Sequence, residues 1–217
     1  MLAGIDIGAV VLQMSILLLS ISIHESAHAW SADRLGDPTA RLQGRVTLNP
    51  IKHLDPVGSL LFPLLGILRG GIVFGWAKPV PVYTHNLKHP RRDHALVAAA
   101  GPASNLLLAF GFLVAYKTLA LFVNPVGLGT DNPLGWLVNF LFFGVILNVV
   151  LAVFNLMPVP PLDGSWIISG LFPPLGRVVD LIRPYGFVIL IVLLYQGVFD
   201  TVLDPVLGFV YSMIYSV

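Results

Sequence analysis

Five consecutive residues, His24-Glu25-Ser26-Ala27-His28, carry the side chains best suited to chemistry in this sequence. On a helix, two histidines four residues apart share one face, about 5–6 Å apart, so both imidazoles can reach one metal ion. Glu25 is the only glutamate in the chain, and its place beside the first histidine suits a general base. The surrounding residues are apolar, and an ionisable side chain in lipid costs about 3 kcal/mol. Three such side chains together therefore predict a functional site.

The composition is that of a membrane protein. Hydrophobic residues make up 56% of the 217 residues and charged residues only 11%, with a mean hydropathy of +0.86. Soluble domains carry about 25% charged residues. Because lipid cannot pair backbone polar groups, we expect an all-α polytopic membrane protein that forms a single domain over residues 1–217. The absence of cysteine excludes disulfides and thiolate metal sites, and a net charge of +1 gives no indication of a nucleic-acid partner.

Apolar runs of sufficient length predict about four to six transmembrane helices. The runs lie at residues 5–32, 94–123, 133–156 and 184–199, with a shorter tail at 204–217 that is either a partial span or an interfacial helix. Residues 56–68 are apolar but short and broken by glycine and proline, which favours a re-entrant or tilted segment. Short membrane-associated β-strands are expected at residues 45–48 and within 70–83, where glycine and proline break the chain.

Charge predicts the orientation of these spans. Lysine and arginine cluster at residues 34–52 and 78–92, so the positive-inside rule places the region 33–93 in the cytosol. Counting spans onward from there brings residues 157–164 to the same side as His24 and His28. The two stretches are therefore expected to meet.

A hydrolytic zinc site takes three protein ligands, so a third ligand is needed beside the two histidines. Asp163 is favoured, since it lies between a run of prolines and a glycine at the start of a short predicted helix, where a helix N-terminus stabilises a carboxylate. His53 and Asp55 remain the second choice. The other histidines lie in or beside a basic loop and are expected to be solvated: His85, His89 and His94.

The sequence resembles the site-2 protease family of intramembrane zinc metalloproteases, the M50-like peptidases. The resemblance rests on three motifs in the family's order: HExxH at residues 24–28, Gly-Pro-Ala-Ser-Asn at 101–105, and NxxPxPPLDG at 155–164. The segments at 49–58 and 75–82 extend it. HExxH alone is weak, whereas HExxH in a membrane span with the downstream motif is highly specific.

The resemblance implies that His24, His28 and Asp163 bind one Zn2+ per chain and that Glu25 is the general base. It also implies that Asn155 helps to hold substrate or the developing oxyanion. The chain lacks the extra N-terminal span of some members and shows no PDZ-like or CBS-like insert, so it is expected to be a compact member.

The implied function is that of a zinc-dependent endopeptidase that cuts in or near transmembrane segments of membrane proteins, as in regulated intramembrane proteolysis. Its partners are transmembrane substrates and the lipid bilayer of the plasma or inner membrane, with the active site toward the cytosol. An oligomer remains open. We hypothesise that residues 70–83 offer a strand edge to an unwound substrate.

Two other classes compete with this interpretation. A transporter or metal-ion carrier also builds sites from broken helices, but it predicts further intramembrane polar clusters and repeat symmetry, which the sequence lacks. A catalytically silent scaffold predicts the loss of Glu25 or of a ligand, and none is lost. More structural interpretations also exist for single residues: Asp163 as a helix N-cap only, and Asn105 with Gly101 and Pro102 in helix start and close packing.

Overall fold

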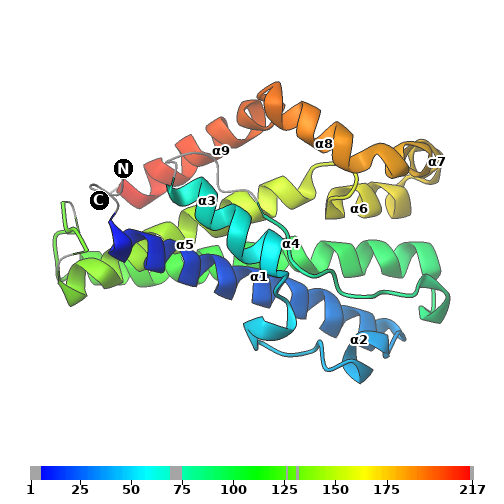
Figure 1. Cartoon of the computed structure of the whole chain (residues 1–217), viewed down its shortest axis with the longest axis horizontal. Coiled ribbons are helices and arrows are strands. Elements are labelled where there is room, and N and C mark those ends of the chain that lie inside the picture. Colours follow the sequence, from blue (N-terminus) through cyan, green and yellow to red (C-terminus); the bar gives the residue numbers. More distant parts are fainter. Residues whose placement is uncertain (1–5, 69–74, 126, 131, 216–217) are drawn as a thin grey trace.

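Long helices dominate the chain, for which a computed structural model describes residues 6–68, 75–125, 127–130 and 132–215. Helices α1, α4 and α5 run side by side, and α8 and α9 lie along one side of them (Figure 1). Five helical runs are long and apolar enough to cross a membrane: α1 (Ile7–Leu35), α4 (Pro90–Ala120), α5 (Pro133–Leu156), the run Pro173–Tyr195, and α9 (Val198–Tyr215). The prediction of a polytopic all-α membrane protein is confirmed.

Caps set the bounds of the long helices. The Asp6 carboxylate accepts the amide of Ala9 at the start of α1, and Gly36 ends that helix with a left-handed backbone, φ 117°. At the start of α5, the Asn132 side chain accepts the amide of Gly135, and Pro133 occupies the first turn. The predicted bounds 133–156 therefore hold.

Shorter elements connect the long helices. Between α1 and α4 these are α2 (Thr39–Leu42), η1 (Pro50–Lys52), η2 (Pro56–Leu61), α3 (Phe62–Leu68) and η3 (Thr84–Asn86). After α5 come α6 (Asp163–Leu171), α7 (Pro173–Ile182), η4 (Arg183–Tyr185) and α8 (Gly186–Tyr195). At about 1.5 Å per residue, η2 and α3 together reach about 20 Å, less than the hydrocarbon thickness of about 30 Å. The expectation that residues 56–68 are too short to span upright holds.

The C-terminal part differs from the prediction. The expected span 184–199 is part of a longer run from Pro173 to Tyr195, and the tail forms α9, itself long enough to span. The arginines of this region made a longer apolar run hard to recognise in the sequence. One of them is accommodated by an aromatic ring, because the Arg183 guanidinium lies 3.3 Å from the centre of the Trp166 ring.

The predicted short β-strands were wrong for the part of the chain that the structure describes, which contains no strand. Residues 45–48 lie in a loop, and residues 75–83 form an irregular segment that ends at η3. Two prolines, Pro79 and Pro81, each lack the N–H donor that a strand ladder needs. The backbone–backbone hydrogen bonds from this segment to the preceding loop are isolated and form no ladder. They run from Trp76 N–H to Gly58 O and from Lys78 N–H to His53 O. Residues 69–74 of the expected strand edge lie outside the described residues.

A hydrophobic core joins α4, α5 and α9. Its buried members are Ala109, Phe112, Tyr116, Val138, Leu141, Val145, Val149, Val210 and Ile214. Gly144 on α5 allows the Phe112 ring of α4 to approach its backbone, and a Cβ there would lie within 3.0 Å of ring atoms. Helix α4 also packs against α1 and α6, so it is the element shared by both halves of the site described below.

One buried carboxylate ties the end of α1 to the segment before α4. Asp37 is fully buried and accepts hydrogen bonds from the Thr39 amide (3.1 Å) and hydroxyl (2.5 Å), the Asn86 side chain (2.9 Å) and the Tyr83 amide (2.6 Å). Burial alone would raise the pKa of Asp37, but the hydrogen bonds outweigh it and hold the pKa below its usual value. The ionised carboxylate therefore stabilises the fold.

We predict that Asp37→Asn lowers the free energy of unfolding by about 1.5–3 kcal/mol at neutral pH, because donors face both carboxylate oxygens and an NH2 group in either place cannot accept them. The native pKa of Asp37 lies below the unfolded value of about 3.9, so its contribution is present above about pH 4 and is lost as the pH falls further. Thermal unfolding of both proteins in detergent between pH 3 and 7 tests this. A difference in stability that stays constant with pH would contradict it.

Candidate active site

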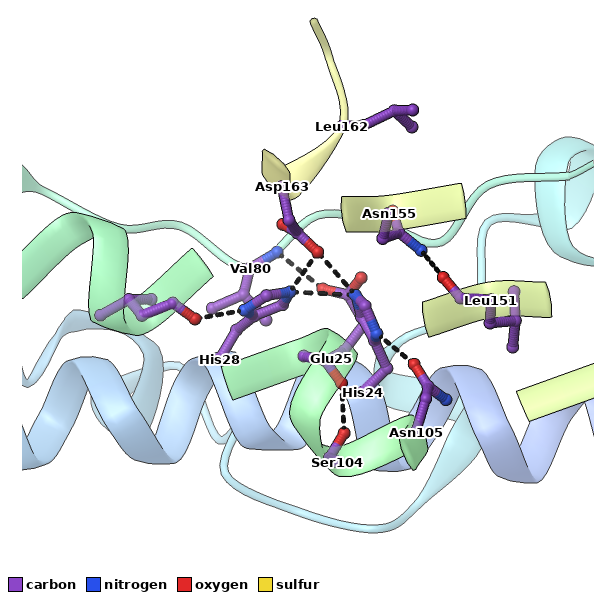
Figure 2. Close-up of polar contacts among 12 residues, drawn as sticks. His24, Glu25, His28, Val80, Ser104, Asn105, Leu151, Asn155, Leu162 and Asp163 are labelled. Carbon is purple, nitrogen blue, oxygen red and sulfur yellow. Dashed lines mark hydrogen bonds and ion pairs between the residues drawn. The ribbon is translucent and has the colours of Figure 1, made fainter. Parts of the chain in front are cut away.

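Two imidazoles of α1 and one carboxylate of α6 converge inside the helix bundle (Figure 2). The Nε2 atoms of His24 and His28 lie 3.0 Å apart. Asp163 Oδ2 lies 3.2 Å from His24 Nε2 and 3.4 Å from His28 Nε2. Both histidines are buried, and Asp163 is nearly so. The structure thus brings together the three residues predicted as metal ligands.

The outer nitrogen of each imidazole is already paired. His28 Nδ1 lies 2.7 Å from the carbonyl oxygen of Val97, and His24 Nδ1 lies 2.6 Å from the side-chain oxygen of Asn105. Oxygens of both kinds only accept hydrogen bonds, so each Nδ1 carries the proton. Each Nε2 therefore presents a lone pair toward the other and toward Asp163.

The three inward atoms fit a zinc ion. Asp163 Oδ2 is buried and accepts no hydrogen bond, so three unpaired acceptors face one another at 3.0–3.4 Å. Without a cation between them, this arrangement is repulsive. Two atoms that each lie 2.0–2.1 Å from a tetrahedral ion are about 3.3 Å apart, and two histidines with one carboxylate form a donor set that zinc takes.

The break after α5 delivers the carboxylate. Helix α5 ends at Leu156, and a proline-rich turn with a cis peptide bond between Pro160 and Pro161 leads into α6. Gly164 lets the start of α6 lie against the carbonyls of Leu156 and Met157, since a Cβ there would come within 3.0 Å of both. The residue that precedes α6 is Leu162, and no side chain caps the helix. The alternative that Asp163 is only an N-cap is therefore wrong.

Helix α4 approaches the two imidazoles through a glycine. A Cβ at Gly101 would lie closer than 3.0 Å to ring atoms of both His24 and His28. The expected close packing at this motif is confirmed, and it occurs at the site itself. The expected helix start is wrong, because α4 begins at Pro90 and Pro102 lies inside it.

Glu25 projects from α1, the helix that carries both histidines, toward the segment 75–83. Its Oε2 accepts a hydrogen bond of 3.2 Å from the amide of Val80. That segment is held from its other side, since the Lys78 amide donates to His53 O at 2.9 Å and the Arg45 guanidinium donates to Lys78 O at 2.5 Å. Burial lowers the pKa of Arg45, and the nearby Glu25 carboxylate partly offsets that shift.

The second choice for a third ligand has a structural role instead. His53 is fully buried, and its Nε2 lies 2.8 Å from the carbonyl of Thr47. Asp55 caps η2 by accepting the amides of Val57 and Gly58. Neither residue joins the cluster of His24, His28 and Asp163.

Two other expectations have different outcomes. His94 was expected to be solvated, which is wrong, because its ring is half-buried and packs 4.2 Å from the Trp166 ring that α6 places there. Asn155 donates its side-chain N–H to Leu151 O at 2.9 Å, one turn back on α5. Its role toward substrate or oxyanion stays a prediction.

Sequence reasoning missed Asn148, which is fully buried on α5 and bonded to Asn105. A signal was present, because Asn148 is a polar residue in an apolar run and lies seven residues before Asn155, so on the same helix face. The amide of Val80 and the carbonyl of Val97 were also missed. Backbone groups leave no trace in residue types.

The fold and site define a polytopic membrane protein with a His-His-Asp centre beside a glutamate. A model of peptidase family M50 matches residues 125–193. The chain is 43% identical over 199 residues to "Putative zinc metalloprotease YwhC" of Bacillus subtilis, which covers 88% of this chain and 84% of that protein. It is 35% identical over 190 residues to "Putative zinc metalloprotease Rip2" of Mycolicibacterium smegmatis, 87% of this chain and 68% of that protein.

A more distant relative is "Putative zinc metalloprotease MJ0611" of Methanocaldococcus jannaschii, 33% identical over 109 residues, 48% of this chain and 51% of that protein. No solved structure matches the chain. The similarity to YwhC extends over most of both proteins, so this chain belongs to peptidase family M50.

We predict that Gly101→Ala weakens zinc binding by more than about tenfold, because the added methyl group must displace at least one imidazole. Chelator competition on the purified protein measures this. Gly111→Ala on the same helix is the matched control, since nothing lies within 4 Å of a Cβ there and zinc affinity should not change. Equal zinc affinity in Gly101→Ala and the native protein would show that the packing is looser than described.

Proposed function

We propose that this protein is a zinc-dependent endopeptidase that hydrolyses peptide bonds in or near transmembrane segments of other membrane proteins. The observation that carries the proposal is the convergence of His24 Nε2, His28 Nε2 and Asp163 Oδ2 within 3.0–3.4 Å inside a bundle of membrane-length helices. Membership of peptidase family M50 supports the reaction class.

In this proposal His24, His28 and Asp163 hold one Zn2+. Zinc, when bound, polarises a carbonyl oxygen and lowers the pKa of water from 15.7 to about 7. Glu25 is the general base: it takes a proton from the attacking water and delivers it to the leaving amine. Its Oε2 is fixed by the Val80 amide, which leaves the other carboxylate oxygen available for that proton.

Asn155 is proposed to contact substrate or the oxyanion. It lies at the last turn of α5, beside the proline-rich turn that leads to Asp163. Its amide nitrogen uses one N–H on Leu151 O and has a second N–H to donate. A peptide bond in an intact helix is hydrogen-bonded and enclosed by side chains, so substrate must unwind before it reaches Asp163.

The site is proposed to face the cytosol of a cell that carries the protein in its plasma or inner membrane. Basic residues gather at the end of the bundle nearest His28, which is the side favoured for cytosolic loops. They are Arg34, Arg41, Arg45, Lys52, Lys78, Lys88, Arg91 and Arg92. At the opposite end, the Thr130 hydroxyl donates a hydrogen bond to the Asp6 carboxylate.

A transporter is less well supported. Among the described residues, His24, His28 and Asp163 are the only group of three or more potential metal-binding side chains that lie close enough to share an ion. The buried amides of Asn105 and Asn148 connect to that same group and not to a second site. A silent scaffold has no need of Glu25 beside them.

Two variants separate zinc binding from proton transfer. Glu25→Gln should keep one zinc per chain and lose about 10²–10⁴-fold in the rate of cleavage, because the general base is removed and the ligands remain. His28→Ala should lose zinc and activity together. Zinc is measured by elemental analysis of purified protein. Substrates for the rate measurement are first captured with the Glu25→Gln variant in cells and identified by mass spectrometry. A zinc-free preparation with full activity would overturn the proposal.

A further inference from the structure

A chain of buried side-chain hydrogen bonds runs from α1 through α5 and α4 and ends on one imidazole of the site. Its members, Ser20, Asn148 and Asn105, are each 0% exposed. We infer that Asn105 and Asn148 are positioning residues that fix which nitrogen of His24 carries the proton, and so keep Nε2 available to a metal ion. The inference rests on the proposed zinc site and adds two residues to what supports it.

The direction of the chain is set at its first link. The Ser20 hydroxyl lies 2.7 Å from the carbonyl oxygen of Ile16, which can only accept, so the single hydroxyl proton is used there. Ser20 Oγ must then accept its other bond, and the partner at 2.9 Å is Asn148 Nδ2. The second proton of that nitrogen goes to Gly144 O at 2.8 Å. Two acceptors therefore fix the Asn148 amide in one orientation.

The same logic passes to the next helix. With its nitrogen turned to α1, Asn148 presents Oδ1 to Asn105, whose Nδ2 donates to it at 2.8 Å. Asn105 must then turn Oδ1 to His24 Nδ1, at 2.6 Å. An amide oxygen cannot donate, so the proton of the neutral His24 ring lies on Nδ1 and the lone pair on Nε2.

Reversing any amide in the chain would leave buried groups mismatched. If Asn105 turned round, its NH2 group would face His24 Nδ1 and its oxygen would face the oxygen of Asn148. Neither mismatch can be relieved by water, because both amides are fully buried in the bundle. The carbonyl of Ile16, two turns along α1 from His24, thus selects the protonation form of that ring.

The second imidazole is controlled differently. His28 Nδ1 donates directly to Val97 O on α4, a backbone group that no side-chain substitution removes. The two histidines of the site therefore differ in their dependence on sequence. Loss of Asn105 or Asn148 should affect His24 and leave His28 correctly oriented.

The test compares zinc affinity by chelator competition in purified full-length variants. Asn105→Leu removes the acceptor and should weaken zinc binding about 10–100-fold, as is usual for the partner of a ligating histidine. Asn105→Asp keeps an acceptor toward His24 and should retain zinc affinity within about threefold of the native protein. Its second oxygen faces Asn148 Oδ1, so the cost of that mismatch should appear as a lower melting temperature. Asn148→Leu should weaken binding by an intermediate amount, because Asn105 then loses its orienting partner.

A matched control is available on α5. Asn139 is half-buried and donates to Leu128 O and Gly135 O, away from the site. Asn139→Leu should lower the melting temperature of the zinc-free protein without changing zinc affinity. If Asn105→Leu and Asn148→Leu behave like this control, the two residues only join helices and the inference is overturned.

A second measurement needs no variant of the chain of amides. Nitrogen NMR of histidine-labelled, zinc-free protein distinguishes the two neutral forms of an imidazole, and a His24→Gln variant assigns the signal. We expect a proton on Nδ1 of His24, and a ring whose only proton is on Nε2 would overturn the inference. Native protein that binds no zinc would instead overturn the proposed function, whatever the NMR result. If the native protein and Asn105→Leu bind zinc with equal affinity, the inference is overturned and the proposed function is not.

Discussion

Lipid around a helix bundle offers no partner to a polar atom, so each one inside this protein must be paired within the chain or held for a ligand. The buried amides and hydroxyl near the site meet this demand, since each polar atom has at least one hydrogen-bond partner. Asp163 Oδ2 does not meet it, nor do the inward nitrogens of His24 and His28 once their outer nitrogens are bonded. Two further buried nitrogens, Arg45 Nε and His53 Nδ1, also lack a hydrogen-bond partner. The site is thus distinguished by three unpaired acceptors that face one another, and not by unpaired atoms alone.

The sequence predicted the structure correctly where a residue type is costly to place in lipid and so has few possible roles there. The spacing of His24 and His28, the bounds 133–156 and the meeting with Asp163 all follow from such costs and from the distribution of positive charge. It failed where a partner decided the outcome. His94 was expected in water because its neighbours in sequence are basic, whereas Trp166 of another helix covers it.

The short strands were wrong for a related reason. Alternating prolines gave residues 75–83 the appearance of extended chain, and the described part of this segment makes only single bonds to the loop of His53 and Gly58. A strand needs a continuous neighbour, and a sequence does not say which carbonyls will be near. The same limit hid Asn148, whose polar partner lies on a helix far along the chain.

Metal binding and proton transfer at Glu25 depend on different parts of the fold. The family match at residues 125–193 covers Asp163 but not the histidines, and the helix packing through Gly101 connects them. The metal-facing atoms are carried by α1 and α6, which both pack against α4, whereas Glu25 is oriented by the amide of Val80 in an irregular segment. The segment is held by separate hydrogen bonds to its neighbours and not by the repeated backbone bonds of a helix, so a change in its position would alter the orientation of Glu25 while the metal-facing atoms stay in place.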